Sequence, residues 1–244
     1  MVKEFLDEHA YGHRSINVAD DPVPWQEAGS PVLPALVVDG IAHSLGHPLQ
    51  AGSLLGIAVE SLGNPVQIGW DLHRVLEAWL EALALVPWEA VLEETPSRGR
   101  STLELAVNTF VPVGLLPDAF TTQRFLWPGS AATGVPGEAA LREYELTIEA
   151  AIADAGQFAA FAEPILEAWA AFLHEQEDAL REQPEREVET PAGTLSYVGL
   201  VDAQRLHAAQ HFRQVTYFFR TSGRPVPRFD PASLSGLRLP DRVY

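Results

Sequence analysis

From about residue 64 onward, apolar residues recur every three or four positions, which is the spacing of one helix face. The segment 70–92 predicts a long amphipathic helix from this spacing, with apolar positions at Leu72, Val75, Leu76, Trp79, Leu80, Leu83 and Leu85. A second helix is predicted over 98–120, where Ser101 and Glu104 have the spacing of a capping box and Pro112 should bend or end the helix.

Residues 138–183 keep the helical spacing and predict one broken helix or two, with Gly156 and Pro164 as the expected breaks. The following segment 184–194 is charged and is interpreted as a linker. Residues 195–222 then predict a long final helix, because Gly223 and a proline two residues later form a typical helix end. The tail 234–244 is irregular but apolar enough to pack on the rest of the protein.

The first 60 residues have a different pattern of short elements. We expect a helix at 2–9, a short β-type run at 14–22, and strands at 35–38 and 41–45 joined by the tight-turn pair Asp39-Gly40. A short helix should follow at 47–57. The chain is therefore expected to be mainly α, with a small α/β unit at 1–62 and a four-helix bundle at 63–244.

Composition narrows the classes of function. The chain has no cysteine, which excludes disulfides, thiolate metal ligands and dithiol redox chemistry within it. Its formal charge of −17 disfavours nucleic acid and anionic lipid as partners. Charged residues interrupt every apolar run, and the charged start lacks the apolar core of a signal peptide, so we expect a cytoplasmic protein without membrane contact.

Two histidines offer the clearest chemistry. His207 and His211 are four residues apart in the final helix and so lie on one face, which Gln214 and Phe218 continue. Two imidazoles at this spacing can chelate a divalent ion if a third ligand is added. The plainer alternative is that one histidine is a core residue and the other faces solvent. Arg213 could bind a substrate carboxylate or form a surface ion pair.

The stretch LHAAQHFRQV, with its HxxxHxxQ pattern, resembles the last helix of the DinB/YfiT-like superfamily, and RGRSTLELAVNTF is similar to the second helix of that family. The resemblance implies a third metal-binding histidine on that second helix, where this chain has Asn108. Residues 2–22 and 33–57 resemble a glutaredoxin-like unit that lacks its first strand and cysteine loop, with Pro34 at the family's cis-proline position.

This resemblance implies a transferase or isomerase that uses a low-molecular-weight thiol and a zinc or nickel ion. In that scheme His207, His211 and Asn108 hold the metal, although an amide oxygen is a much poorer ligand for these ions than imidazole. Gln214 would support a ligand, and the remaining candidates to line the site or bind substrate are Arg213, Phe218 and Glu104.

Two alternatives follow from the missing cysteine and the asparagine. One is a metal-free enzyme in which His207 or His211 acts as a general base. The other is a non-catalytic protein that binds a small molecule or has a purely structural role. A small-molecule partner and a homodimer are expected in either case.

Overall fold

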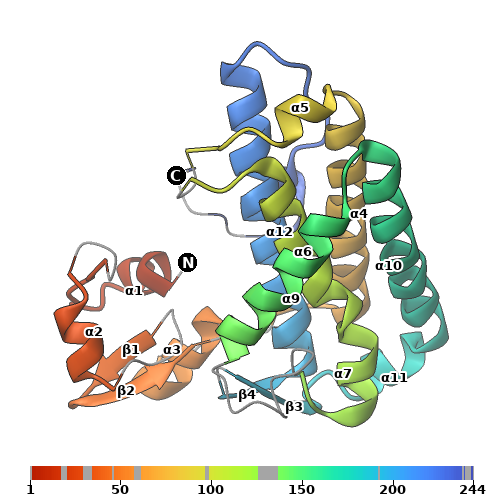
Figure 1. Ribbon diagram of the computed structural model, residues 1–244. Helices are drawn as coiled ribbons and strands as arrows, with labels where there is room; N and C mark the ends of the chain where they lie inside the picture. The colour runs from red at the N-terminus through yellow and green to blue at the C-terminus, as the bar shows by residue number, and fades with distance from the viewer. Residues whose placement is uncertain are drawn as a thin grey trace.

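The computed structural model describes residues 2–17, 21–29, 35–45, 47–57, 62–96, 99–125, 137–191, 193–237, 239 and 243. The chain is mainly helical, with two small antiparallel hairpins (Figure 1). Its N-terminal part contains α1 (Val2–Glu8), α2 (Val23–Glu27), β1 (Ala35–Val38), β2 (Ile41–Ser44) and α3 (Pro48–Leu55). The remainder contains α4 (Pro65–Ala84), α5 (Trp88–Val91), α6 (Thr102–Gly114), α7 (Leu116–Thr122), α9 (Gly137–Ala151), α10 (Ala155–Glu175), α11 (Glu177–Glu182), β3 (Glu187–Thr190), β4 (Gly193–Ser196), α12 (Tyr197–Thr221) and the 3₁₀ turn η1 (Pro231–Ser233).

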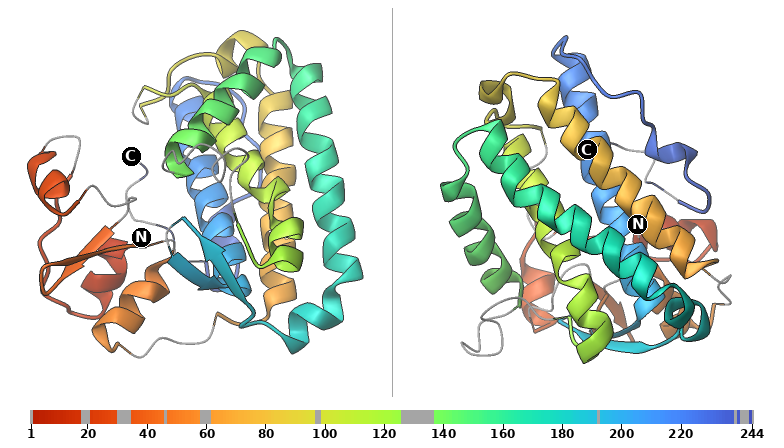
Figure 2. Two further views of the ribbon diagram at one scale, coloured as in Figure 1. Left: turned by 60° about the horizontal axis from the view of Figure 1, so that its bottom comes forward. Right: turned by 90° about the vertical axis from the view of Figure 1, so that its right-hand side faces the viewer.

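Four long helices form the body of the protein. Helix α12 packs on α4, α4 on α10, α10 on α6, and α6 again on α12, so that the four enclose one apolar core (Figure 2). The indole N–H of Trp79 on α4 donates to the backbone oxygen of Ala208 on α12 at 3.2 Å. The indole N–H of Trp169 on α10 donates to the backbone oxygen of Gly69 on α4 at 3.1 Å. Each bond therefore joins two helices of the core. A Cβ on Gly69 would lie 2.5 Å from the Leu173 side chain, so α4 and α10 approach closely here and a larger residue would force Leu173 to move.

Helices α6 and α12 each begin directly after a serine that caps the helix. Ser101 and Glu104 form the predicted capping box at the start of α6, with Glu104 N–H donating to Ser101 Oγ at 3.1 Å and Ser101 N–H to Glu104 Oε2 at 2.7 Å. Ser196 caps α12 in the same way through the N–H of Gly199. Pro112 does not stop α6 at once, and the helix ends two residues later at Gly114.

The expected breaks at Gly156 and Pro164 were wrong. Helix α10 runs through both residues, and the break lies just before it, where Asp154 caps the new helix by accepting from the N–H of Gln157 at 2.8 Å. Pro164 is exposed, so the carbonyl that loses its helical donor can bond to water.

The segment interpreted as a charged linker is instead the hairpin β3–β4. Glu187 and Glu189 face solvent while Val188 and Thr190 are buried, so the segment has the two-residue alternation of a half-buried strand. Its charges occupy only the exposed face. In the N-terminal part, residues 14–17 are irregular, so the described portion of the expected β-type run is not a strand.

The N-terminal part has its own small core, formed by Phe5, Leu6, Leu45 and Ala51. Strands β1 and β2 pair across the predicted Asp39-Gly40 turn, whose residues both have positive φ (50° and 80°), as a two-residue type I′ turn requires. Pro34 lies outside the described residues. The division into units at residue 62 stays a prediction, because residues 58–61 are also outside them.

The stretch Thr102–Thr122, which covers α6 and α7, is long and apolar enough to cross a membrane by length and composition alone, although the sequence had suggested no such run. It is 67% buried inside the protein, as a core helix is. At the other end of the chain, Leu234 and Leu237 of the tail are buried against the bundle, as the sequence predicted.

Candidate functional site

His207 and His211 form a close pair on α12. Their ring centroids are 4.5 Å apart at an interplanar angle of 66°, so one ring meets the other edge to face. His211 is buried and His207 is partly buried. The helical spacing therefore brings the two imidazoles together as the sequence predicted.

Gln214 orients the second histidine. Its Oε1 lies 2.7 Å from His211 Nδ1, and because an amide oxygen only accepts, Nδ1 must carry the proton. When His211 is neutral, its unprotonated nitrogen is then Nε2. This is the arrangement in which an imidazole is ready to accept a proton or bind a metal.

The surroundings of the pair keep His207 neutral. Burial lowers the pKa of His207 well below its ordinary value of 6.5, and the neighbouring His211 and the positive charge of Arg100 lower it further. Arg100 comes from the loop between α5 and α6, where its backbone oxygen accepts from Thr95. Sequence reasoning missed Arg100, because only the fold brings this loop towards α12.

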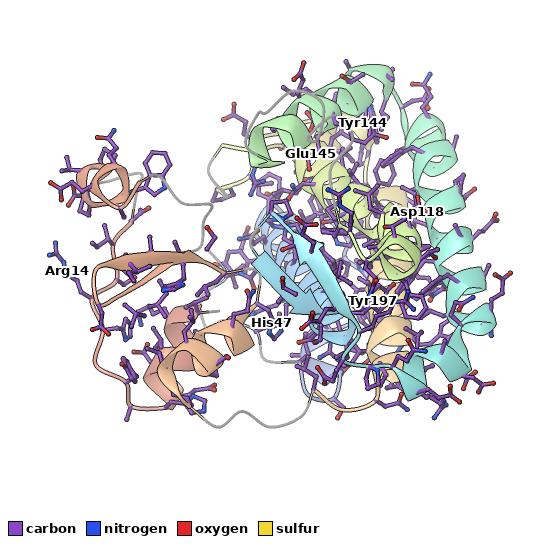
Figure 3. All side chains as sticks on the ribbon, turned by 90° about the horizontal axis from the view of Figure 1, so that it is seen from below. Arg14, His47, Asp118, Tyr144, Glu145 and Tyr197 are labelled. Carbon is purple, nitrogen blue, oxygen red and sulfur yellow. The ribbon has the colours of Figure 1, made fainter. Side chains whose placement is uncertain are left out.

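Asn108, the third expected metal ligand, is engaged with another helix. Its Nδ2 donates to Glu145 Oε1 of α9 at 2.7 Å, and Glu145 is buried with only 2% of its surface exposed. Burial raises the pKa of Glu145, while the hydrogen bond from Asn108 and the charge of Arg142 oppose that rise. Figure 3 labels Glu145 on the helix that covers α6.

Glu104 has two structural roles. Besides closing the capping box, its Oε1 accepts from Arg142 at 2.6 Å, and Arg142 also bonds to Glu149 at 2.6 Å. This is the role that the capping-box pattern had suggested. It ties α9 to the start of α6 and leaves no sign that Glu104 completes a metal site.

The other expected site residues lie beside the pair in sequence but make contacts of their own. Arg213 donates to Gln210 at 3.5 Å, and Phe218 lies under the guanidinium of Arg224, 5.5 Å from its ring centroid. Phe110 of α6 and Leu206 of α12 are both buried in the apolar core.

A three-ligand metal site does not fit the residues present. In the parts of the chain that the structure describes, no group of three His, Cys, Asp or Glu side chains is placed to hold one ion. The two imidazoles could supply two ligands, while Asn108 is bonded through its amide to Glu145. We therefore derive no chemical step through a metal.

A second buried polar centre lies on another face of α12. Arg205, 2% exposed, donates through Nε to Asp202 Oδ1 at 2.8 Å and through Nη1 to Asp71 Oδ2 at 3.3 Å. Asp202 Oδ2 in turn lies 2.9 Å from His47 Nε2. Figure 3 shows His47 where the N-terminal part meets the bundle, so this centre fastens the two parts together. Sequence reasoning found no partner for His47, because its partner is 155 residues away.

Comparisons with protein-family models, with curated proteins and with solved structures found no match to this chain.

Proposed function

We propose that the protein is an enzyme that joins a low-molecular-weight thiol to a small electrophilic substrate, with His207 and His211 as the groups that move the proton. We further propose that its four helices are a DinB/YfiT-like bundle. The observation that carries the functional proposal is the edge-to-face contact of His207 and His211, together with the lowered pKa of His207 in the field of Arg100.

These groups suit the activation of a thiol. A thiol becomes a strong nucleophile only as the thiolate, and a nearby base and a positive charge favour that form. The unprotonated imidazole supplies the base and Arg100 supplies the charge. The formal charge of −17 gives the rest of the protein little capacity to hold an anion, which increases the importance of Arg100.

The proposed reaction conserves protons and electrons. The thiol proton moves to an imidazole nitrogen, and a sulfur electron pair forms a bond to the electrophilic carbon of the substrate. The leaving group departs with the electrons of its broken bond. A basic leaving group takes the proton back from the imidazolium, whereas with a chloride leaving group the imidazolium releases the proton to water. The products are a thioether, the leaving group and one proton, and the imidazole returns to its starting state.

The test is a thiol-transfer assay with glutathione and L-cysteine as thiols and 1-chloro-2,4-dinitrobenzene as electrophile. We expect turnover by the wild type and a roughly 10²-fold or larger loss in His207→Gln and His211→Gln, as for removal of a general base. His174→Gln, at an exposed position on α10, is the matched control and should retain activity. Equal rates in all three variants would contradict the proposal.

The same assay separates metal-free chemistry from metal chemistry. Activity that persists after EDTA treatment supports the histidine pair acting alone. Activity that disappears with EDTA and returns with zinc or nickel would instead assign the pair to metal binding. No turnover with either thiol, together with a folded protein, would favour the non-catalytic binding role.

A further inference from the structure

A cavity of about 480 Å³ lies at the junction of the N-terminal part and the bundle, away from the histidine pair. Its walls come from β2, α3 and the turn between β3 and β4, and its lining residues are His43, Ser44, Leu45, Gln50, Ser53, Leu54, Pro191 and Gly193. This volume is within the range of small-molecule sites, which often lie where two units meet. His207 is eleven residues into α12 from Ser196, or roughly 16 Å along the helix, so the two sites are distinct.

The walls are held in place by contacts across the junction. Gln50 Nε2 donates to the backbone oxygen of Thr194 at 3.1 Å, and Gln50 Oε1 accepts from the N–H of His47 at 3.1 Å. The side chain of His47 is itself bound to Asp202 of α12. Figure 2 shows the β3–β4 hairpin on the side of the bundle that faces the N-terminal part. The cavity is therefore formed before any ligand binds.

The register of the first hairpin leaves the backbone N–H and C=O of Ser44 without a partner in β1, at the wall of the cavity. Val38 and Ile41 flank a two-residue turn and so exchange both of their hydrogen bonds, as do Leu36 and His43. Ser44, one position further, then directs its N–H and C=O away from β1. No β1 residue lines the cavity, so it lies on this outer side of β2. Within the described part of the chain, Ser44 makes no hydrogen bond from that outer edge.

The lining also sets the charge of a ligand. Among the described residues it includes the hydroxyls of Ser44 and Ser53 and the imidazole of His43, but no Asp, Glu, Lys or Arg. An ionic ligand would lose water there without gaining an opposite charge, which is costly. Leu45 and Leu54 offer an apolar surface beside the polar groups.

We propose that this cavity is a second binding site, which takes a small uncharged amide with an apolar side chain. The ligand would add to the edge of β2 as one residue of a strand. Its carbonyl accepts from Ser44 N–H, and its N–H donates to Ser44 C=O, while its apolar group rests on Leu45 and Leu54.

The test uses N-acetyl-L-leucinamide as the probe, with binding to the full chain followed by two-dimensional NMR titration. Its analogue methylated at the leucine nitrogen loses the donor to Ser44 C=O, and we expect its dissociation constant to be about three- to tenfold higher, the effect of one hydrogen bond. N-acetyl-L-leucine, which carries a carboxylate, should bind more weakly than the amide as well.

The matched variants are Ser44→Pro and Ala42→Pro. Each removes one outward N–H from the same edge strand, where proline is tolerated, but only Ser44 lines the cavity. Ser44→Pro should raise the dissociation constant about three- to tenfold, and Ala42→Pro should leave it within about twofold. If circular dichroism shows that Ser44→Pro is unfolded, Ser53→Trp replaces it by filling the cavity, with Ser15→Trp at an exposed position as its control.

Three results would overturn the proposal. The first is that the probe does not bind at all up to its solubility limit. The second is equal affinity for the amide and its N-methylated analogue. The third is equal weakening by the cavity variant and its control. None of these results bears on the thiol-transfer proposal, because neither His207 nor His211 is altered.

Discussion

Replacing Arg205 by methionine removes a cation that contacts both Asp71 and Asp202 of the buried centre on α12. Asp71 and Asp202 are both 3% exposed, and Arg205 also donates to the backbone oxygens of Ser235 and Gly236 at 3.2 and 3.5 Å. The variant leaves two buried carboxylates without their guanidinium and frees the start of the tail. Methionine has a similar length, so loss of packing volume should be small.

The expected loss of stability is about 3 kcal/mol. Removing one partner of a buried ion pair costs about 3–5 kcal/mol, because the other charge stays desolvated. The lower end applies here, since Asp202 keeps His47 at 2.9 Å, and Asp71 keeps Gln67 at 2.9 Å and Arg74 at 3.8 Å. For a chain of this size the melting temperature should fall by roughly 6–12 °C.

The measurement is urea unfolding followed by tryptophan fluorescence at neutral pH, since Trp79 and Trp169 are both buried in the core. Arg220→Met, at an exposed position on the same helix, is the control and should change stability by less than about 0.5 kcal/mol. A triple variant that adds Asp71→Asn and Asp202→Asn to Arg205→Met should recover part of the loss, because neutral amides cost less to bury than unpaired carboxylates. A loss below about 1 kcal/mol in Arg205→Met, or no recovery in the triple variant, would refute the reasoning.

Three further predictions concern single side chains. The pKa of His207 is lower in the folded protein than its ordinary value of 6.5, so the unfolded chain takes up this proton first as the pH falls. The free energy of unfolding of the wild type should therefore decrease below about pH 6.5. Urea titrations over that range should show a smaller decrease for His207→Gln. Glu145 should have the opposite pH dependence, because its raised pKa means that its ionisation in the folded protein costs stability as the pH rises through the folded-state pKa. Glu145→Gln should therefore be more stable than the wild type at neutral pH. In thermal melts at acid pH the two proteins should have similar melting temperatures. Ser101→Ala removes the cap of α6 and should cost about 1 kcal/mol in urea unfolding, and an unchanged midpoint would show that the capping box contributes nothing.

Local patterns in the sequence predicted the elements whose signals lie within a few residues. The periodicity of 70–92 and 195–222 predicted α4 and α12 because a helix buries a stripe that recurs every three or four positions. Capping at Ser101 and the Asp39-Gly40 turn were equally local, and both are confirmed. The pairing of His207 with His211 belongs to this class too, since one helix turn separates them.

Errors arose where a local signal had two interpretations. The glutamates of 187–190 were interpreted as a linker because nothing in the segment itself shows that Val188 and Thr190 have a surface to pack against. Gly156 and Pro164 were interpreted as breaks, yet Gly156 lies in the first turn of α10, just after the actual break, and α10 packs on α4 and α6 and continues past Pro164. The stabilisation from tertiary packing can exceed the unfavourable helix propensity of a single residue.

By itself the sequence determined the helical class, the main helix positions, the lack of any cysteine thiol in the chain and the histidine pair. Each of these depends on composition or on spacing along one element. Only the tertiary structure decided which distant groups act on one another: the charge of Arg100 lowers the pKa of His207, Asn108 bonds to Glu145, and His47 bonds to Asp202. The physical reason is that burial and charge pairing act through space, between residues whose separation in the chain carries no local signal.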